Sequence, residues 1–551
     1  MRVKRNFICS LLAGLSVVNL TACSQPDEQY FGKLDTPKEN ILRVGNGAEP
    51  RSFDPHKSIA YAEGHIYLNI FESLTSRDPK TLEAMPALAT GWESKDDART
   101  WVFHLRKGAT FTDGKAITAQ DFVWSWQRLV NPANASPYVF AALPIKNAQA
   151  VFDGKLPLSQ LGVRALDDNT LEVNLEQPTP IFPKLASAWA FVALPRHVIE
   201  RYGDAWSRPE HLVSNGPFQV ADYRPYDQVV LTKSPTYWDH DQVRLDKIVL
   251  LPVSDQSQNT NLYRAGELDI VRNLYLPDAL IPALSKRKDF RSGSFFGAYY
   301  LEFNVKHKPF DDIRVRRALN LAIDREAITS RYLKVLNMQP ACSVVPPILS
   351  GYSAPRCTMY NPKRARALLV EAGYPGGKNF PAVSIDIINH GTTITASQAI
   401  QRMWKEQLGI HVNIQMEESQ THMARAESRN FSILSGGWIG DYMDPAAFLD
   451  LYIDTNSNNH TDWKDSEYIA LMKKAEGAAD IKQRLYWMHA AEARLIDQAP
   501  LAPLVFMGTQ SMQKPWVKGL YANPLGQNSF KSVWIDHRWQ RESVIATKVK
   551  P

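Results

Sequence analysis

A glycine-rich segment that ends in an aspartate has the residue types best suited to ligand binding in this sequence. Gly436-Gly437-Trp438-Ile439-Gly440-Asp441 follows the apolar, strand-like run 431–434. Glycines at a strand end let a second backbone approach closely, and an unpaired strand edge there could accept an extended peptide. The carboxylate of Asp441 could then pair with an ammonium group. The alternative is a plain turn in which Asp441 caps a helix at 446–449.

Sequence signatures of catalysis and of metal binding are not found. There is no Gly-x-Ser-x-Gly elbow, no His-Glu-x-x-His and no phosphate-binding loop. The 13 histidines are scattered, and none has a partner at metal-ligand spacing. We therefore expect no enzymatic activity, no metal and no cofactor, although a triad assembled in space leaves no such signature.

The N-terminus has the pattern of an export signal. Basic residues precede an apolar run over 7–18, which is shorter than the roughly 20 residues of a membrane span. Leu20-Thr21-Ala22-Cys23 looks like a bacterial lipobox, so we expect residues 1–22 to be removed and Cys23 to be acylated. A chance cysteine after an ordinary signal is the alternative. We expect a lipid-anchored protein of the periplasm or cell envelope, with 23–40 as a flexible tether.

The rest of the chain has the composition of a large globular protein. Cleavage removes three basic residues and lowers the formal net charge from +6 to +3. Such a weak charge without a basic stripe argues against a nucleic-acid partner. The length of 551 residues predicts more than one lobe. Cys342 and Cys357 flank a Pro/Ser-containing loop and could form a disulfide outside the cytoplasm; the alternative is two free buried thiols.

Hydrophobic periodicity predicts a mixture of strands and helices. Half-buried strands are expected at 101–105 and 171–175, and a fully buried one at 248–251. Asp312 and Asn361 are placed to cap helices. A further run of strand 383–387, helix 397–408 and strand 410–414 predicts a strand–helix–strand unit with a parallel sheet, so we expect an α/β fold.

Short motifs in a fixed order carry a family resemblance over residues 42–534. They are Ser52-Phe53-Asp54-Pro55-His56, FHLRKG at 103–108, FTDG at 111–114, AQDF at 119–122, SNGPF at 214–218, PTYW at 235–238, YRAGELD at 263–269 and DIRVRRA at 312–318. Together they resemble the extracellular solute-binding proteins of the peptide/nickel family, or family 5. Asn131-Pro132 and SPY at 136–138 look more like the oligopeptide branch.

The resemblance implies a two-lobed periplasmic-binding-protein type II fold with a hinge. The first lobe would comprise 41–75, 203–296 and 510–545, with an extra domain inserted at 76–202, and the second lobe would comprise 297–509. Ligand would lie between the lobes, which close around it. The family also implies a monomer that captures peptides and delivers them to the membrane permease of an ABC importer.

The resemblance further assigns roles to individual residues. Asp441 matches the aspartate that holds the ammonium group of the ligand. The remaining ligand-binding matches are Gly436, Gly437 and Trp438 on one side of the peptide main chain, Glu63, Gly64 and His65 on the opposing side, and Tyr138 beside it.

Two departures from the oligopeptide branch concern the ligand carboxylate and a disulfide. Ser435 stands where an arginine often binds that carboxylate, and the usual disulfide positions map to Gly297 and Ile439. The candidates to replace the arginine are Arg425, Arg429 and His422. The alternative is that the ligand has no carboxylate near Ser435, as would be the case for a murein peptide, a capped peptide or a longer peptide.

Other functions remain open from sequence. A carrier of the same fold could take haem, a nickel chelate or an antimicrobial peptide. A peptide chaperone or sensor would use the same cleft without import, and an exported hydrolase is a further alternative.

Overall fold

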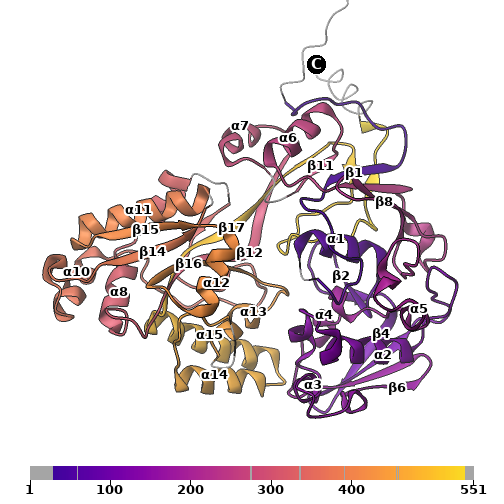
Figure 1. The fold of residues 1–551 in the computed structure, drawn as a ribbon, viewed down its shortest axis with the longest axis horizontal. Coiled ribbons are helices and arrows are strands. Elements are labelled where there is room, and N and C mark those ends of the chain that lie inside the picture. Colours follow the sequence, from indigo (N-terminus) through magenta and orange to yellow (C-terminus); the bar gives the residue numbers. More distant parts are fainter. Residues whose placement is uncertain are drawn as a thin grey trace, which may run out of the picture.

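The computed structural model describes residues 29–58, 60–272, 276–333, 337–389, 391–453, 456 and 458–539. The expected signal segment and Cys23 lie outside these residues. Among the helices described, none has the length and apolar character needed to span a membrane. The fold is mixed α/β, as predicted, and consists of two bodies connected by long strands (Figure 1).

One mixed sheet runs through both bodies in the order β15-β14-β16-β12-β17-β11-β1-β10-β9-β8, with β13 beside β17. Its two longest strands, β12 (Phe290–Phe303) and β17 (Leu501–Gln513), pair antiparallel and pass from one body to the other (Figure 1). The other strands are β1 (Ile41–Gly45), β8 (Phe218–Arg224), β9 (Gln228–Lys233), β10 (Lys247–Leu251), β11 (Ile270–Val271), β13 (Gln339–Pro340), β14 (Val383–Ile388), β15 (Val412–Glu417) and β16 (Ile433–Ile439). The two bodies therefore share one main-chain hydrogen-bond ladder.

The body that contains β16 holds the predicted parallel unit. β14 and β15 pair parallel over six positions and are connected by α11 (Gly391–Leu408), which begins earlier than expected. The side chain of Asp312 caps α8 (Ile313–Leu321) and that of Asn361 caps α10 (Pro362–Glu371), which confirms both predicted caps. The remaining helices of this body are α9 (Arg325–Ala327), α12 (Ser419–Ser428), α13 (Ala446–Leu449), α14 (Ser466–Glu476) and α15 (Ile481–Gln498).

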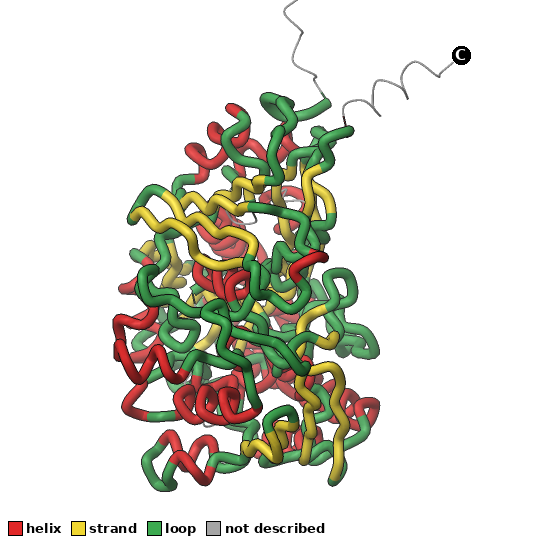
Figure 2. The backbone as a smooth tube through the Cα atoms, turned by 90° about the vertical axis from the view of Figure 1, so that its right-hand side faces the viewer, coloured by secondary structure: helices red, strands yellow, loops and turns green. Residues whose placement is uncertain are grey.

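The other body adds a second, antiparallel sheet. Its order is β4 (Ala89–Lys95), β5 (Thr100–Leu105), β7 (Thr170–Asn174) and β6 (Val163–Asp167), and α2 (Ala119–Val130) packs on it through buried Trp126. The hairpin β2 (Thr75–Arg77) and β3 (Ala84–Pro86) lies near α1 (Tyr61–Ile70) (Figure 1). The short helices are α3 (Ala148–Phe152), α4 (Phe182–Leu185), α5 (Arg196–Tyr202), α6 (Gln256–Ala265) and α7 (Ile281–Leu284). Long irregular segments cross the face seen in Figure 2.

Two predicted strand environments were wrong. β5 was expected to be half-buried, but on its second face only His104 is exposed and Val102 is buried as well. The strand at 248–251 was expected to be fully buried. Only Ile248 and Leu250 are buried in β10, since one face packs on a core cluster while Val249 on the other face is partly exposed.

Candidate functional site

The strand β16 has one edge that is only partly paired. All seven of its residues, Ile433–Ile439, pair with β12, whereas β14 pairs only with Ile433 and Leu434. From Ser435 onward, no strand in the described part of the chain covers the other edge. An unpaired strand edge is a template for adding a further strand.

Alternation along β16 decides which main-chain groups face this edge. The N–H of Gly440 donates to the carbonyl of Phe296 on β12, at 2.8 Å. Because the direction alternates in an antiparallel pair, Ser435, Gly437 and Ile439 turn their N–H and C=O groups away from β12. His422 occupies the Ser435 carbonyl, with Nε2 at 2.9 Å from that oxygen. Gly437 and Ile439 therefore offer the accessible part of the edge.

The glycines of this strand are explained by tyrosine rings of β12. A Cβ atom on Gly436 would lie 2.8 Å from Cε2 of Tyr300, and one on Gly437 would lie 2.8 Å from Cδ1 of Tyr299. Both separations are shorter than atoms tolerate, so glycine is required for packing at these two positions. Close approach of a ligand backbone is not needed to explain them.

Asp441 follows directly after this edge and does not cap a helix. The N-cap of α13 is Pro445, and the N–H of Ala446 donates to Oδ1 of Asp444 at 3.0 Å. Asp444 is in turn held by Arg484, with both guanidinium Nη atoms within 2.9 Å of its carboxylate. The plain-turn alternative for Asp441 was therefore wrong, and its carboxylate is left for other partners.

The surroundings of Asp441 come from the opposite body. Arg77, at the end of β2, donates from Nη2 to the carbonyl of Asp441 at 3.5 Å and from Nε to Oγ of Ser187 at 3.0 Å. Asp441 is solvent-exposed as a residue, yet the protein atoms around its carboxylate desolvate it and raise its pKa to about 6. The charge of Arg77 acts in the other direction and lowers that pKa. A carboxylate with so little internal compensation can accept a ligand cation.

Tyr138 lies beside this pair of charges. Burial raises the pKa of its phenol, and the negative charge of Asp441 raises that pKa further. Its ring centroid lies 5.2 Å from that of Trp189 and 4.9 Å from that of Phe140. The structure thus brings Asp441, Tyr138 and Arg77 together from chain segments far apart in sequence.

The predicted opposing segment lies within a helix. Glu63, Gly64 and His65 belong to α1, and the N–H of Gly64 donates to the carbonyl of Ala60 at 3.1 Å. Glu63 is buried and accepts from the N–H of Arg51 at 2.9 Å. His65 is also buried, and burial lowers its pKa well below the usual value, so its imidazole is neutral. In this structure Glu63 and His65 thus contribute to the interior of their body.

Gly64 has a spatial role instead. A Cβ atom there would lie 2.9 Å from Cη2 of Trp189, so this glycine lets the indole pack against α1. The indole N–H groups of Trp189 and Trp438 are shielded from solvent and have no acceptor among the described residues. Such unpaired donors are rare, and a ligand carbonyl is a suitable partner for each.

Sequence reasoning missed Arg77 and Trp189. Arg77 is a single basic residue in a three-residue strand, and Trp189 stands in an apolar run that resembles core. Neither has a local signal of ligand contact. Their proximity to Tyr138 and to Asp441 depends on how distant segments pack.

Comparisons with known proteins identify the family. The model of the bacterial extracellular solute-binding proteins, family 5 Middle, matches residues 83–460. The chain belongs to this family.

Relatives of this family-5 protein match it over nearly their whole length. The periplasmic oligopeptide-binding protein OppA of Salmonella typhimurium is 33% identical over 90% of this chain and 93% of its own. The periplasmic murein peptide-binding protein MppA of Escherichia coli is 34% identical over 94% and 95%. The crystal structure of Haemophilus influenzae OppA in complex with RPPGFSPFR has a TM-score of 0.78 at 30% identity, covering 91% of this chain and 100% of that one. These relatives are binding proteins, and the predicted two-lobed α/β fold is confirmed.

The disulfide predicted for this family-5 protein is present. Cys342 and Cys357 are bonded with their Cα atoms 6.0 Å apart. The loop between them is also held by Glu492, which accepts from the N–H groups of Val344 and Val345 at 2.9 Å. The chain therefore fixes a loop after β13 by one covalent and several polar links.

The positions to which the oligopeptide-branch disulfide maps lie opposite each other. Gly297 on β12 and Ile439 on β16 are register partners, and neither is a cysteine. A Cβ atom on Gly297 would lie 2.6 Å from Sδ of Met507, so a larger residue there would displace the Met507 side chain.

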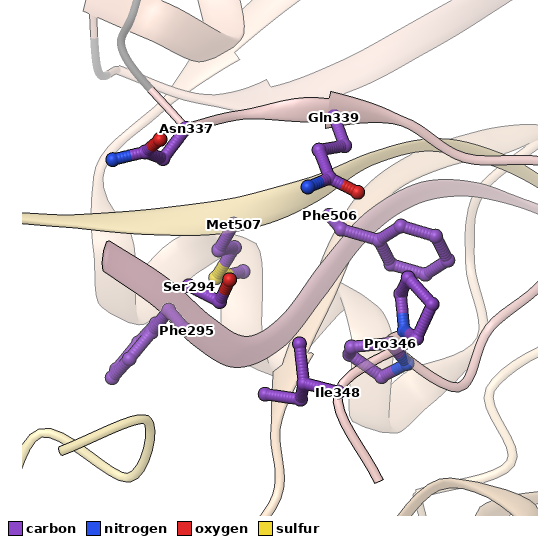
Figure 3. Close-up of a pocket in the computed structure, with 9 residues that line it drawn as sticks. Ser294, Phe295, Asn337, Gln339, Pro346, Ile348, Phe506 and Met507 are labelled. Atoms are coloured by element: carbon purple, nitrogen blue, oxygen red, sulfur yellow. The ribbon is translucent and has the colours of Figure 1, made fainter. Parts of the chain in front are cut away.

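A small pocket lies where β12 and β17 cross between the bodies of this family-5 protein. Its lining includes Ser294, Phe506 and Met507 from the two strands and Gln339 from β13 (Figure 3). None of the expected ligand-binding residues lines this pocket. The candidate site is defined instead by the groups that face each other at Asp441. No cluster of three metal-binding side chains occurs in the described residues.

Proposed function

We propose that this chain captures extended peptides and delivers them to the permease of an ABC importer. The observation that supports it most is the open edge of β16 that ends at Asp441. An added strand that runs antiparallel to β16 would start at Asp441, where its ammonium group meets a carboxylate. The name of Salmonella typhimurium OppA supports the ligand class.

Main-chain pairing would supply affinity with little dependence on peptide sequence. Gly437 and Ile439 would exchange hydrogen bonds with the ligand backbone, while Trp438, Gly436 and Tyr138 shape the walls. Glu63, Gly64 and His65 would support the opposing wall from inside their body. We propose no cofactor, no catalytic step and no nucleic-acid partner, since binding and release are all that delivery requires.

Closure of the two bodies would follow from ligand capture. Arg77 belongs to one body and donates to the carbonyl of Asp441 in the other, so the contact forms only when the bodies approach. We propose lobes at 41–75 with 203–296 and 510–545, an inserted domain at 76–202, and a second lobe at 297–509. The hinge would lie in β12 and β17, the strands that pass between the bodies.

The proposed location is the periplasm or cell envelope, with the protein as a monomer anchored through an acylated Cys23. Periplasmic relatives and the lipobox-like tetrapeptide support this location. An anchor near the membrane would raise the effective concentration of the protein at its permease. Mass spectrometry of the mature N-terminus, purified from its own cells, tests the anchor.

Calorimetry with free and N-acetylated tetrapeptides tests the proposed function. Acetylation removes the ammonium charge and keeps the main chain, so we expect at least about 30-fold weaker binding, by the lower end of the range for a buried charge pair. Equal affinity for the two forms would contradict the role of Asp441.

A murein peptide is a second candidate ligand, favoured by 34% identity to MppA. Native mass spectrometry of the purified protein distinguishes the two, since a murein peptide has a defined mass and an oligopeptide mixture does not. A bound haem or metal would point instead to another carrier of the same fold.

A further inference from the structure

The open edge of β16 ends at a polar cluster. β14 and β15 run parallel, and Glu417 is the last residue of β15. The next helix, α12 (Ser419–Ser428), carries His422 and Arg425 back toward β16, where His422 contacts Ser435. We call Glu417, His422, Arg425 and Ser435 the edge cluster.

The cations near this end of the edge already have anionic partners. Arg425 places Nε 2.6 Å and Nη2 2.5 Å from Oε1 of Glu417, and Nη1 donates to the carbonyl of Asn430 at 3.0 Å. Arg429 places Nη1 3.1 Å from Oδ1 of Asp462. Both arginines that could have replaced the missing one at Ser435 are therefore engaged by internal carboxylates. A ligand carboxylate would have to displace them.

One ring nitrogen of His422 is committed as a donor. Its Nε2 lies 2.9 Å from the Ser435 carbonyl, which can only accept, so Nε2 carries the hydrogen. In the neutral ring Nδ1 is then a lone pair, and it faces Oε2 of Glu417 at 3.6 Å. Two acceptors that face each other lack a donor between them.

Three polar atoms of the edge cluster are shielded from solvent. Oε2 of Glu417, Nδ1 of His422 and Oγ of Ser435 have no hydrogen-bond partner in the described structure. The side chain of Glu417 is only 8% exposed. A buried carboxylate oxygen without a donor is costly, because it has lost its water without gaining a partner.

The surrounding charge also favours a donor. Burial raises the pKa of Asp386, a buried residue of β14, and Glu417 raises it further, while Arg425 and His422 lower it. The carboxyl groups of Glu417 and Asp386 thus lie near one guanidinium, that of Arg425. A positive group would balance the cluster.

We propose that the edge cluster binds a basic side chain of the peptide rather than its terminal carboxylate. The inference rests on the proposed function, since it places the ligand along β16 with its ammonium group at Asp441. Asp441 and Ser435 are six residues apart, about 20 Å of extended chain. An extended ligand advances about 3.4 Å per residue, so its seventh residue lies opposite Ser435. The stem of a lysine or other diamino acid spans several ångströms, which brings the fifth and sixth ligand residues within reach as well.

Calorimetry with matched heptapeptides tests this inference. Heptapeptides of alanine with one lysine at the fifth, sixth or seventh position are each compared with the same peptide carrying norleucine, which keeps the stem without the charge. We expect the wild-type protein to bind at least one lysine peptide about tenfold more tightly, as for one added charge-assisted hydrogen bond. Glu417→Gln should abolish the difference while binding of the norleucine peptide changes little.

Asp462→Asn is the matched control, because it removes a nearby carboxylate that also pairs with an arginine but does not face His422. This variant should keep the lysine preference. Thermal unfolding of both variants verifies that the fold is intact. Equal affinity for lysine and norleucine peptides in the wild type, or tighter binding of a glutamate peptide, would overturn the inference. Binding of no peptide at all would overturn the proposed function with it.

Discussion

The pH dependence of peptide affinity examines the proposed role of Asp441 most directly. Desolvation raises the pKa of this carboxyl to about 6 in the ligand-free protein, and only its ionised form pairs with an ammonium group. At pH 5, one unit below that pKa, about one molecule in ten is ionised. We therefore expect the affinity to fall about tenfold between pH 7 and pH 5.

The upper side of the profile has a different cause. The ligand α-amino group loses its proton near pH 8, so affinity should decline again above that value. Between about pH 6.5 and 7.5 both groups are charged and affinity should be highest. A bell-shaped profile therefore reports the pair rather than either group alone.

Asp441→Asn supplies the matched variant for this measurement. It keeps the shape of the side chain and removes the charge, so the binding free energy at pH 7 should become about 2–5 kcal/mol less favourable. The remaining binding should be nearly constant from pH 5 to 7.

The same substitution should not lower the free energy of unfolding. Because the pKa is raised in the folded protein, ionisation costs folding free energy above that pKa, and the variant should be at least as stable at pH 7.

The assay is calorimetry of one tetrapeptide across pH 5–8.5, with urea unfolding of both proteins at pH 7. The reasoning is refuted if the asparagine variant shows the same fall in affinity below pH 6, because another group would then cause it. It is also refuted if urea unfolding shows that the variant is destabilised and this destabilisation accounts for the whole loss of affinity.

Three further perturbations follow from the site and its surroundings. Arg77→Gln removes a contact between the bodies, so calorimetry should show about threefold to tenfold weaker peptide binding. The acidic midpoint of the affinity–pH profile should rise, because a positive charge near Asp441 is lost, and an unchanged midpoint would contradict this. Gly437→Ala forces a methyl group to 2.8 Å from the ring of Tyr299 and should lower the free energy of unfolding in urea by about 1–3 kcal/mol, an effect that Tyr299→Ala should partly relieve. Replacing both Cys342 and Cys357 by serine should lower the free energy of unfolding by about 3 kcal/mol at most and leave peptide affinity unchanged, and a loss of affinity would show that this loop touches the ligand.

Local signals allowed parts of the fold to be predicted. The caps Asp312 and Asn361 act within one helical turn, and the alternation in β14 and β15 depends on residues two apart, so all were readable in sequence. The partial exposure of Val249 was not readable, because it depends on what covers the second face of β10.

The candidate site could likewise be predicted only where the signal was local in sequence. The segment at Asp441 was recognisable as a glycine-flanked strand end, but the free edge follows from the early end of pairing with β14. The contact of Arg77 joins residues 364 positions apart. Asp444 rather than Asp441 accepts from the first N–H of α13, and the two aspartates three residues apart could not be distinguished by spacing alone.

The continuous ladder of β12 and β17 has an energetic consequence. Because the same two strands pass through both bodies, the bodies can separate by backbone torsion around the irregular register near Ser294 without breaking the ladder. Opening then breaks the contacts between the bodies, such as that of Arg77 with Asp441. Each 1.4 kcal/mol among those contacts changes the ratio of open to closed molecules tenfold. The contact of Arg77 can therefore shift the fraction of molecules that are closed around a peptide.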